Sequence, residues 1–224
     1  MQMEGFKMRS DAELQRAVLE ELRWDPSVDA ANIGVAVKDG VVVLTGTVPN
    51  WSQRYAAERA AKRVRGVKAI ANDIEVRLPG TDEMDDAEIA KRARDALEWD
   101  VVVPADQITV TVSNGWVKLE GEVQWNYERT AAERAVRNIR GVKGVTNLIT
   151  VKPKVAPTDL KAKIEAALRR HAEEDADNIR VEVDGSKVTL RGRVHSWTER
   201  EAAEEAAWAA PGVTYVDNQI EVVP

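Results

Sequence analysis

The chain of 224 residues contains no cysteine and only two histidines, His171 and His195. The absence of cysteine excludes disulfides, thiolate nucleophiles and zinc sites built on thiolates. Neither histidine has a carboxylate cluster at metal-ligand spacing beside it, so we interpret each as a lone surface histidine. The sequence also lacks a Walker loop, a G-x-G-x-x-G, a G-x-S-x-G and an H-E-x-x-H motif. We therefore expect no catalytic residues, no metal, no cofactor and no enzyme activity.

Long apolar runs are also absent. No segment approaches the ~20 apolar residues that a membrane-spanning helix needs, so we expect no transmembrane segment. Residues Met1 to Ser10 lack the apolar core and small-residue cleavage site of a secretory signal. On this basis we expect a cytoplasmic protein, or a periplasmic one if a signal peptide has been removed.

The chain is built instead from a unit that occurs three times. Two glycines and one asparagine keep their spacing in each copy: Gly46, Gly66 and Asn72; Gly121, Gly141 and Asn147; and Gly192, Gly212 and Asn218. Such self-similarity indicates repeated domains. We place an N-terminal tail at 1–10, units at 11–79, 86–153 and 158–224, and linkers at 80–85 and 154–157.

Within a unit, hydrophobic periodicity predicts a helix, a β-hairpin, a second helix and a final strand. Apolar residues at helical spacing, such as Leu14, Val18 and Leu22, open the first unit, and Asp11 and Asp86 are predicted helix N-caps. Asp39-Gly40 and Asn114-Gly115 predict two-residue type I′ turns. In the third unit, Asp184-Gly185-Ser186 predicts a loop one residue longer.

The repeated glycines and asparagines are interpreted as structural. Gly46, Gly121 and Gly192 fall on the core face of the second strand, where a missing side chain would let the alanine-rich second helix approach. Gly66, Gly141 and Gly212 are predicted left-handed C-terminal caps of that helix. For Asn72, Asn147 and Asn218 we favour a tie from the last strand to a neighbouring loop or helix end over a ligand role.

The order of elements, the repeated Val-x-Leu-x-Gly-x-Val segment (Val42 to Val48, Val117 to Val123, Val188 to Val194) and the Gly-Val-x-x-[Ile/Val]-x-Asn ending resemble the BON domain. The resemblance covers nearly the whole chain as three tandem copies of an OsmY-like type. It implies an α+β fold in which each domain is a three-stranded mixed sheet with two helices on one face. It also implies a protein without enzyme activity that associates with phospholipid or envelope components, often under osmotic stress.

The open face of each sheet is a first candidate surface. Alternation places Val41 and Val43 on this face in the first unit and Trp116 in the second. An apolar patch exposed on a protein usually marks an interface, although Val41 and Val43 could instead reflect strand propensity alone. We favour an interface.

An aromatic and arginine cluster near the start of each second helix is the other candidate. The clusters consist of Trp51, Arg54 and Tyr55; Trp125, Tyr127 and Arg129; and Trp197 and Arg200. Such residues suit a lipid headgroup boundary, where guanidinium groups bind phosphate, and they equally suit a protein interface. A third reading makes each tryptophan a staple that holds the helix start to the sheet edge.

Charge differs between the units. The second helices of units 1 and 2 are basic, whereas Glu199, Glu201, Glu204 and Glu205 make the third acidic. This complementarity predicts contact between units 3 and 1, within a chain or between chains. The short, proline-containing second linker predicts that units 2 and 3 are held more rigidly together than units 1 and 2. No unit is strongly basic, and the net charge is −6, which argues against a nucleic-acid partner.

The sequence therefore indicates a non-enzymatic binding protein that associates with an anionic phospholipid or envelope surface in a stress response. The alternative is a self-assembling scaffold, a homo-oligomer or other protein-binding module that does not use lipid.

Overall fold

The computed structural model describes residues 9–80, 84–153, 159–171 and 179–223. The predicted linker 154–157 and part of the linker 80–85 lie outside these residues.

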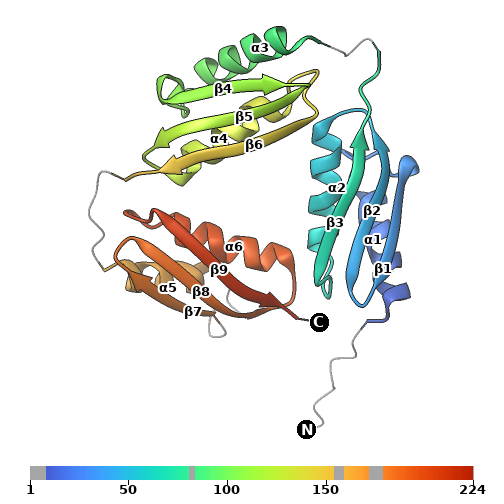
Figure 1. Cartoon of the computed structure of the whole chain (residues 1–224). Coiled ribbons are helices and arrows are strands. Elements are labelled where there is room, and N and C mark those ends of the chain that lie inside the picture. The colour runs from blue at the N-terminus through green and yellow to red at the C-terminus, as the bar shows by residue number, and fades with distance from the viewer. Residues whose placement is uncertain (1–8, 81–83, 154–158, 172–178, 224) are drawn as a thin grey trace.

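Each unit forms one domain with two helices and three strands (Figure 1). Domain 1 contains α1 (Asp11–Trp24), β1 (Ile33–Lys38), β2 (Val41–Val48), α2 (Trp51–Arg63) and β3 (Ala69–Val76). Domain 2 contains α3 (Asp86–Trp99), β4 (Ile108–Ser113), β5 (Trp116–Val123), α4 (Asn126–Arg137) and β6 (Gly144–Val151). Domain 3 contains α5 (Leu160–His171), β7 (Ile179–Asp184), β8 (Lys187–Val194), α6 (Trp197–Trp208) and β9 (Tyr215–Val222).

The three sheets share one topology, which confirms the predicted α+β fold. The middle strand of each sheet pairs antiparallel with the first strand and parallel with the last, in the orders β1-β2-β3, β4-β5-β6 and β7-β8-β9. The second helix makes the crossover that the parallel pair requires. Both helices cover the same face of their sheet, and among the described residues no helix of the same domain covers the other face (Figure 1).

The core of each domain forms between the sheet and the two helices. In domain 1 the first helix buries Leu14, Val18 and Leu22, while α2 contributes only the small residues Ala57, Ala60 and Ala61. The cores of domains 2 and 3 join into one cluster, whereas the core of domain 1 is a separate one. The hydrophobic core is therefore continuous between domains 2 and 3, and the relative rigidity expected from the linkers stays a prediction.

The hairpin turns confirm two predictions and correct a third. Asp39-Gly40 and Asn114-Gly115 have the positive φ angles of type I′ turns (53° and 81°, 53° and 79°). In domain 3, Asp184 pairs directly with Lys187, so the turn has two central residues and not three. Gly185 (φ 58°) takes the first of them, where type II′ turns favour glycine. The predicted extra residue was wrong because Asp184 belongs to the strand.

Asp11 and Asp86 are not the N-caps. Ser10 and Asp85 cap the helices through hydrogen bonds from the backbone of Glu13 and Glu88. The Asp11 carboxylate instead accepts hydrogen bonds from the backbone N–H groups of the turn at Asp39 (2.8 Å) and Gly40 (3.0 Å). The carboxylate of Asp86 binds the turn at residues 114 and 115 in the same way. The start of each of these first helices therefore holds a hairpin in place.

The strand glycines are required by the neighbouring strand and not by the second helix. Gly46, Gly121 and Gly192 have φ angles of 120°, 149° and 153°. A Cβ at Gly46 or Gly121 would lie well under 3.0 Å from the carbonyl oxygen of Asn32 or Gln107, just before the first strand. The close approach of two backbones thus replaces the predicted approach of the helix. Gly66, Gly141 and Gly212 have the predicted positive φ (89°, 91° and 98°), in the turn after each helix C-cap.

The repeated asparagines make the structural tie that we favoured. In domain 2 the Asn147 amide nitrogen donates to the Arg129 carbonyl (2.9 Å) and to Glu133 (3.3 Å), and its oxygen accepts from the backbone of Ile149. Asn72 and Asn218 repeat this set with the corresponding residues of α2 and α6. The amide joins the last strand to the first turns of the second helix.

The three domains close into a ring (Figure 1). At the start of α2, the Ser52 hydroxyl donates to the side chain of Asn138, just beyond the end of α4 (2.6 Å). At the start of α6, the Thr198 hydroxyl donates to the Lys62 carbonyl near the end of α2 (3.4 Å). The start of α4 faces the end of α6 across a pocket that Tyr127 and Trp208 line. The second helices therefore follow one another head to tail, in the manner of a closed cyclic assembly within one chain.

Candidate functional site

The aromatic and arginine cluster of domain 1 lies against domain 2. Trp51 is the first residue of α2, and its ring meets Trp116 edge to face, with centroids 5.8 Å apart at 60°. Arg54 covers the Trp51 ring at 5.0 Å and donates to the Asn72 carbonyl (2.7 Å). The guanidinium of Arg137 from α4 lies over the Tyr55 ring, 4.1 Å from the ring centroid. All three side chains are half-buried and take part in contacts within or between domains.

The cluster of domain 3 lies against domain 1 in the same way. The partly buried Trp197 packs on the core of domain 1. Arg200 lies 5.1 Å from the Trp197 ring centroid and donates to the carbonyls of Asn218 and Ile220 in β9. Trp51 and Trp197 are therefore equivalent residues with equivalent roles.

The cluster of domain 2 differs by one position. Counting five residues on from the strand glycine leads to Trp51 and Trp197 in domains 1 and 3 but to Asn126 in domain 2. Trp125 is the residue before α4, and its ring stacks on Tyr127 at 6.3 Å. Arg129 lies over Trp208 of domain 3, 4.7 Å from the ring centroid. Burial lowers the pKa of Arg129 below its ordinary value, although Glu204 and Glu133 act against this.

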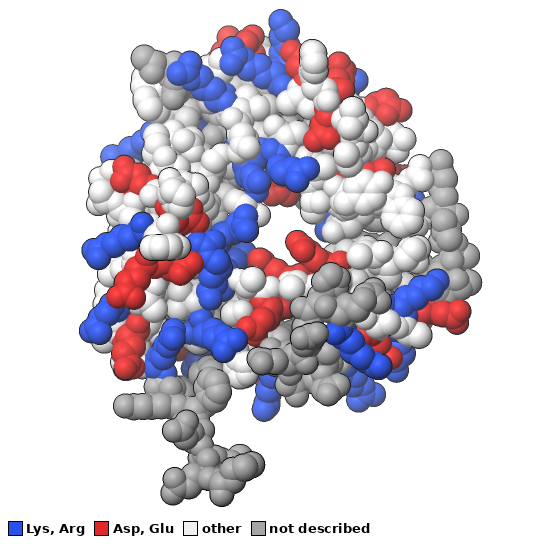
Figure 2. Space-filling view, turned by 180° about the vertical axis from the view of Figure 1, so that it is seen from behind, with Lys and Arg blue, Asp and Glu red and all other residues white. Residues whose placement is uncertain are grey.

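Ion pairs close the ring between domains 3 and 1. Lys62 Nζ lies 2.8 Å from Glu201 and 3.0 Å from Glu58, and Arg65 is 3.9 Å from Glu199. Burial acts to lower the pKa of Lys62, but hydrogen bonds with Glu201 and Glu58 outweigh it and raise the pKa above its ordinary value. These contacts confirm the predicted meeting of the acidic and basic helices, here within one chain. Figure 2 shows an opening through the ring with basic side chains along one part of its rim and acidic ones along another.

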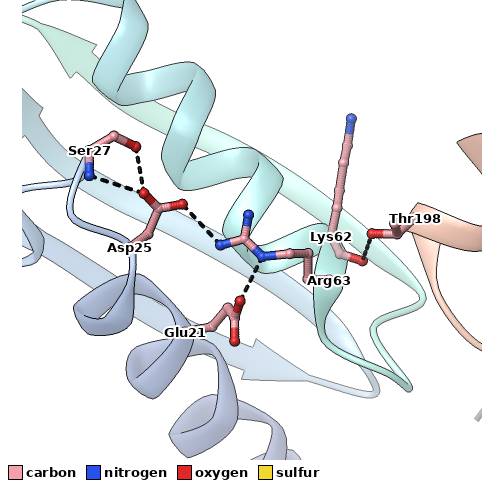
Figure 3. A network of polar contacts seen from close by, with 6 residues as sticks. All are labelled: Glu21, Asp25, Ser27, Lys62, Arg63 and Thr198. Atoms are coloured by element: carbon pink, nitrogen blue, oxygen red, sulfur yellow. Dashed lines mark hydrogen bonds and ion pairs between the residues drawn. The ribbon is translucent and has the colours of Figure 1, made fainter.

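A second polar network lies next to this contact (Figure 3). Arg63, the last residue of α2, donates to Glu21 (2.6 Å) and to Asp25 (3.0 Å) at the end of α1. Asp25 also accepts from the hydroxyl and the backbone N–H of Ser27. The hydrogen bond from the Ser27 hydroxyl lowers the pKa of Asp25, burial acts to raise it, and Arg63 lowers it further. The pKa of Asp25 therefore lies below its ordinary value. The network joins both helices of domain 1 to the loop before β1.

Both histidines belong to domain 3. The backbone carbonyl of His195 accepts a hydrogen bond from the Gly66 N–H (3.2 Å), which adds to the contact between domains 3 and 1. His171 ends α5, and its side chain lies outside the described part. Within the described residues, no group of three or more histidine or acidic side chains could hold a metal ion.

The open sheet faces keep some exposed apolar residues. Val41 is 37% exposed and Val43 is half-buried, as the alternation predicts for this face. Trp116 is 43% exposed, and its indole N–H donates to the Thr146 hydroxyl (2.7 Å). Its ring lies across Gly144, where any Cβ would clash with it. Trp116 is thus held flat on its own sheet, where it receives Trp51.

The sequence reasoning missed two tryptophans. Trp24 and Trp99 are 84% and 86% exposed at the ends of α1 and α3, and Val101 beside the second is 99% exposed. Each tryptophan follows the last buried leucine of its helix, Leu22 or Leu97, by two residues. That position faces solvent in an amphipathic helix. A large aromatic residue at a solvent-facing position indicates a contact surface, and the sequence shows this at Trp24 and Trp99.

The chain is similar in sequence to two known proteins. Over 130 residues the chain is 27% identical to osmotically-inducible protein Y of Escherichia coli strain K12. The matched segment covers 56% of this chain and 65% of that relative, slightly under two thirds of the relative's length. It is 31% identical over 142 residues to the 21 kDa hemolysin of Actinobacillus pleuropneumoniae, or 62% of this chain and 73% of that protein. Among solved structures, CdsD of the Chlamydia trachomatis type III secretion system aligns over 93% of this chain and 91% of its own, at 14% identity with a TM-score of 0.25, too low to support an argument.

Across the described ranges, no helix is both long enough and apolar enough to pass through a bilayer.

The family model described as the BON domain matches residues 10–77, 85–153 and 157–224. Three matches account for nearly the whole chain and coincide with the three folded domains. The chain therefore belongs to the BON domain family, as three copies in tandem.

Proposed function

We propose that the protein is a non-enzymatic binding protein that docks on anionic phospholipid surfaces in an osmotic or general stress response. The observation that carries the proposal is the pair of exposed tryptophans, Trp24 and Trp99. Tryptophan favours the headgroup boundary of a bilayer, where its ring is buried and its N–H remains hydrated.

The ring arrangement supports a shared surface. Trp24 and Trp99 occupy equivalent positions at the ends of α1 and α3 in neighbouring domains of the ring, and the proposal is that one bilayer surface meets both. Arg23 precedes Trp24, and Arg59 and Arg134 are exposed on the second helices of the same two domains. At a bilayer surface, arginine side chains bind lipid phosphate groups.

The residues that the sequence suggested for lipid contact have other partners. Trp51, Tyr55 and Trp197 lie in contacts between domains, so we assign the lipid surface to the first helices. The alternative of a self-assembling scaffold rested partly on unit 3 meeting unit 1 of another chain. That pairing is made within the chain, which favours the lipid proposal.

Co-sedimentation with vesicles tests the proposal. The wild type, a Trp24→Ala/Trp99→Ala double variant and a matched Leu148→Ala/Tyr215→Ala variant are mixed with neutral phosphatidylcholine vesicles or with vesicles that contain phosphatidylglycerol. Leu148 and Tyr215 are apolar surface residues of the sheets, 53% and 55% exposed. We expect wild type and matched variant to bind anionic vesicles, more weakly at higher salt, and the tryptophan variant to lose binding. No binding by the wild type, or equal binding by all three proteins, would refute the proposal.

A further inference from the structure

Two of the contacts around the ring place a cation at the same position but give it different partners. When the domains are aligned on their strand glycines, Arg137 corresponds to Lys62, and Tyr55 corresponds to Glu201. Between domains 3 and 1, Lys62 forms an ion pair with Glu201. Between domains 1 and 2, Arg137 lies over the Tyr55 ring instead. The second contact therefore has the cation without the carboxylate.

A pocket of about 290 Å³ lies at the contact between domains 1 and 2. Arg137 and Asn138 line it from the end of α4, and Tyr55 and Arg59 line it from α2. A pocket of this size suits a small ligand. The cation that lacks a carboxylate thus borders a space that a small molecule can enter.

The charged side chains of the lining leave two positive charges over. Arg63 and Asp25 also line the pocket, and Arg63 is paired with Asp25 (3.0 Å) and with Glu21 (2.6 Å). Arg59 and Arg137 form no ion pair with any described residue. Two such guanidinium groups at one small pocket favour a ligand that carries two negative charges.

An uncharged donor lies beside these arginines. The side-chain oxygen of Asn138 accepts the hydrogen bond from the Ser52 hydroxyl (2.6 Å). The amide NH₂ of Asn138 makes no hydrogen bond with a described residue, so it can donate to a ligand in the pocket.

The neighbouring pocket is less suited to an anion. It shares Tyr55 and Arg137 with the first pocket and is also lined by Arg134, Glu133 and Glu205. Two carboxylates offset two guanidinium groups there. The unbalanced positive charge therefore lies at the contact between domains 1 and 2.

We propose that this contact binds the phosphate group of a small soluble phosphate monoester, held by Arg59, Arg137 and the Asn138 amide. A guanidinium group binds phosphate oxygens through paired N–H donors, and a monoester carries a charge of about −1.5 to −2 at pH 7. The phosphodiester of a lipid headgroup shares this chemistry but carries a single charge, so the monoester is the better match. The inference goes beyond the proposed function, because it requires no bilayer.

The full chain labelled with ¹⁵N provides the test. The probe is methyl phosphate at pH 8, and dimethyl phosphate is the singly charged control, both at constant ionic strength. We expect the backbone amide signal of Asn138 to shift in a saturable way with methyl phosphate, with a dissociation constant on the order of 1 mM, and dimethyl phosphate to bind several-fold more weakly.

Two outcomes of this titration would overturn the proposal. One is the absence of a saturable shift with methyl phosphate. The other is equal binding of the two compounds, which would identify a diester headgroup as the source of the phosphate. Neither outcome depends on vesicles, so this proposal and the lipid proposal can fail separately.

A pair of arginine variants tests the site itself. Arg59→Gln removes one of the two unpaired guanidinium groups and should weaken methyl phosphate binding about tenfold. Arg16→Gln is the matched control, because Arg16 is an exposed arginine of α1 outside the lining and its loss changes the net charge equally. Equal weakening in both variants would reveal general attraction to a charged surface and would overturn the proposal.

Supplying the carboxylate from within is the stricter arm. Tyr55→Glu places a carboxylate at the position that Glu201 occupies in domain 3, opposite Arg137. Its negative charge should neutralise Arg137 and abolish the methyl phosphate shift. Unchanged binding by a folded Tyr55→Glu protein would overturn the proposal, and Arg59→Gln, at an exposed residue, decides the matter should Tyr55→Glu not fold.

Discussion

Lys62 Nζ lies 2.8 Å from the Glu201 carboxylate and thereby joins α2 of domain 1 to α6 of domain 3. The two side chains are 23% and 45% exposed, so water screens the pair in part. We expect a double-mutant cycle with Lys62→Ala and Glu201→Ala to give a coupling of about 0.5–1 kcal/mol in urea unfolding, smaller at high salt.

The charge-swapped protein provides the control for this pair. Lys62→Glu alone places like charges together and should lower stability, and adding Glu201→Lys should recover part of the loss. A coupling of zero would mean that the pair contributes nothing to ring closure.

The inserted tryptophan should matter more than the ion pair. Trp197→Ala removes a ring that packs on the core of domain 1, and we expect a loss of about 2 kcal/mol with an increase in the radius of gyration by small-angle X-ray scattering. Trp24→Ala, at a residue 84% exposed, is the matched control and should change neither quantity appreciably. Similar effects of the two substitutions would contradict the assigned role of Trp197.

Asn147 should be essential to domain 2. Replacing it by alanine removes the hydrogen-bond donor to the Arg129 carbonyl and to Glu133, and removes the acceptor for the Ile149 N–H. We expect a loss of about 1–3 kcal/mol by chemical denaturation. Asn114→Gly, in the hairpin turn, is a control at which a type I′ turn tolerates the change. A neutral Asn147→Ala would show that the tie is dispensable.

Gly121 should tolerate no side chain. Its Cβ would collide with the Gln107 carbonyl, and its φ of 149° disfavours other residues. We expect Gly121→Ala to cost more than about 2 kcal/mol, measured as a drop in Tm. Gly80→Ala is the matched substitution, because nothing lies within 4 Å of a Cβ there, and it should be neutral. Equal Tm values for the two variants would refute the steric account.

Acid should weaken domain 1 through two carboxyl groups. The pKa of Asp25 is lowered, and so is that of Glu58, where burial acts to raise it but hydrogen bonds from Asn72 and Lys62 outweigh burial. A lowered folded-state pKa gives stability that is complete above the ordinary values, 3.8 and 4.5, and is lost as the pH falls through the lowered ones. We expect Tm to fall between about pH 5 and about pH 2, and less steeply in Asp25→Asn. Identical pH profiles would exclude Asp25 from this effect.

The sequence was sufficient for what depends on local chemistry. The spacing of Leu14, Val18 and Leu22 predicts the buried stripe of α1, and Asn114-Gly115 predicts its turn, because neither needs knowledge of distant residues. The role of Gly121 could not be predicted correctly, because its steric neighbour, the Gln107 carbonyl, is brought close only by strand pairing.

The candidate sites show the same division. Charge complementarity predicted that α2 and α6 meet, and Lys62 and Glu201 do so. The burial of Trp51 at a domain contact required the ring, since the sequence alone allowed a lipid surface as readily. The exposure of Trp24 could have been inferred from helical periodicity. Its proposed role in lipid binding depends on knowing that Trp51, Tyr55 and Trp197 lie in contacts between domains.

The central structural claim is that one chain closes into a ring through contact of domain 3 with domain 1. Because the chain has no cysteine, spin labels can be placed uniquely at Arg59→Cys on α2 and Ala202→Cys on α6, both exposed. The account predicts one narrow short distance distribution by double electron–electron resonance, which Trp197→Ala broadens. A broad or long distribution in the wild-type background would contradict the closed ring.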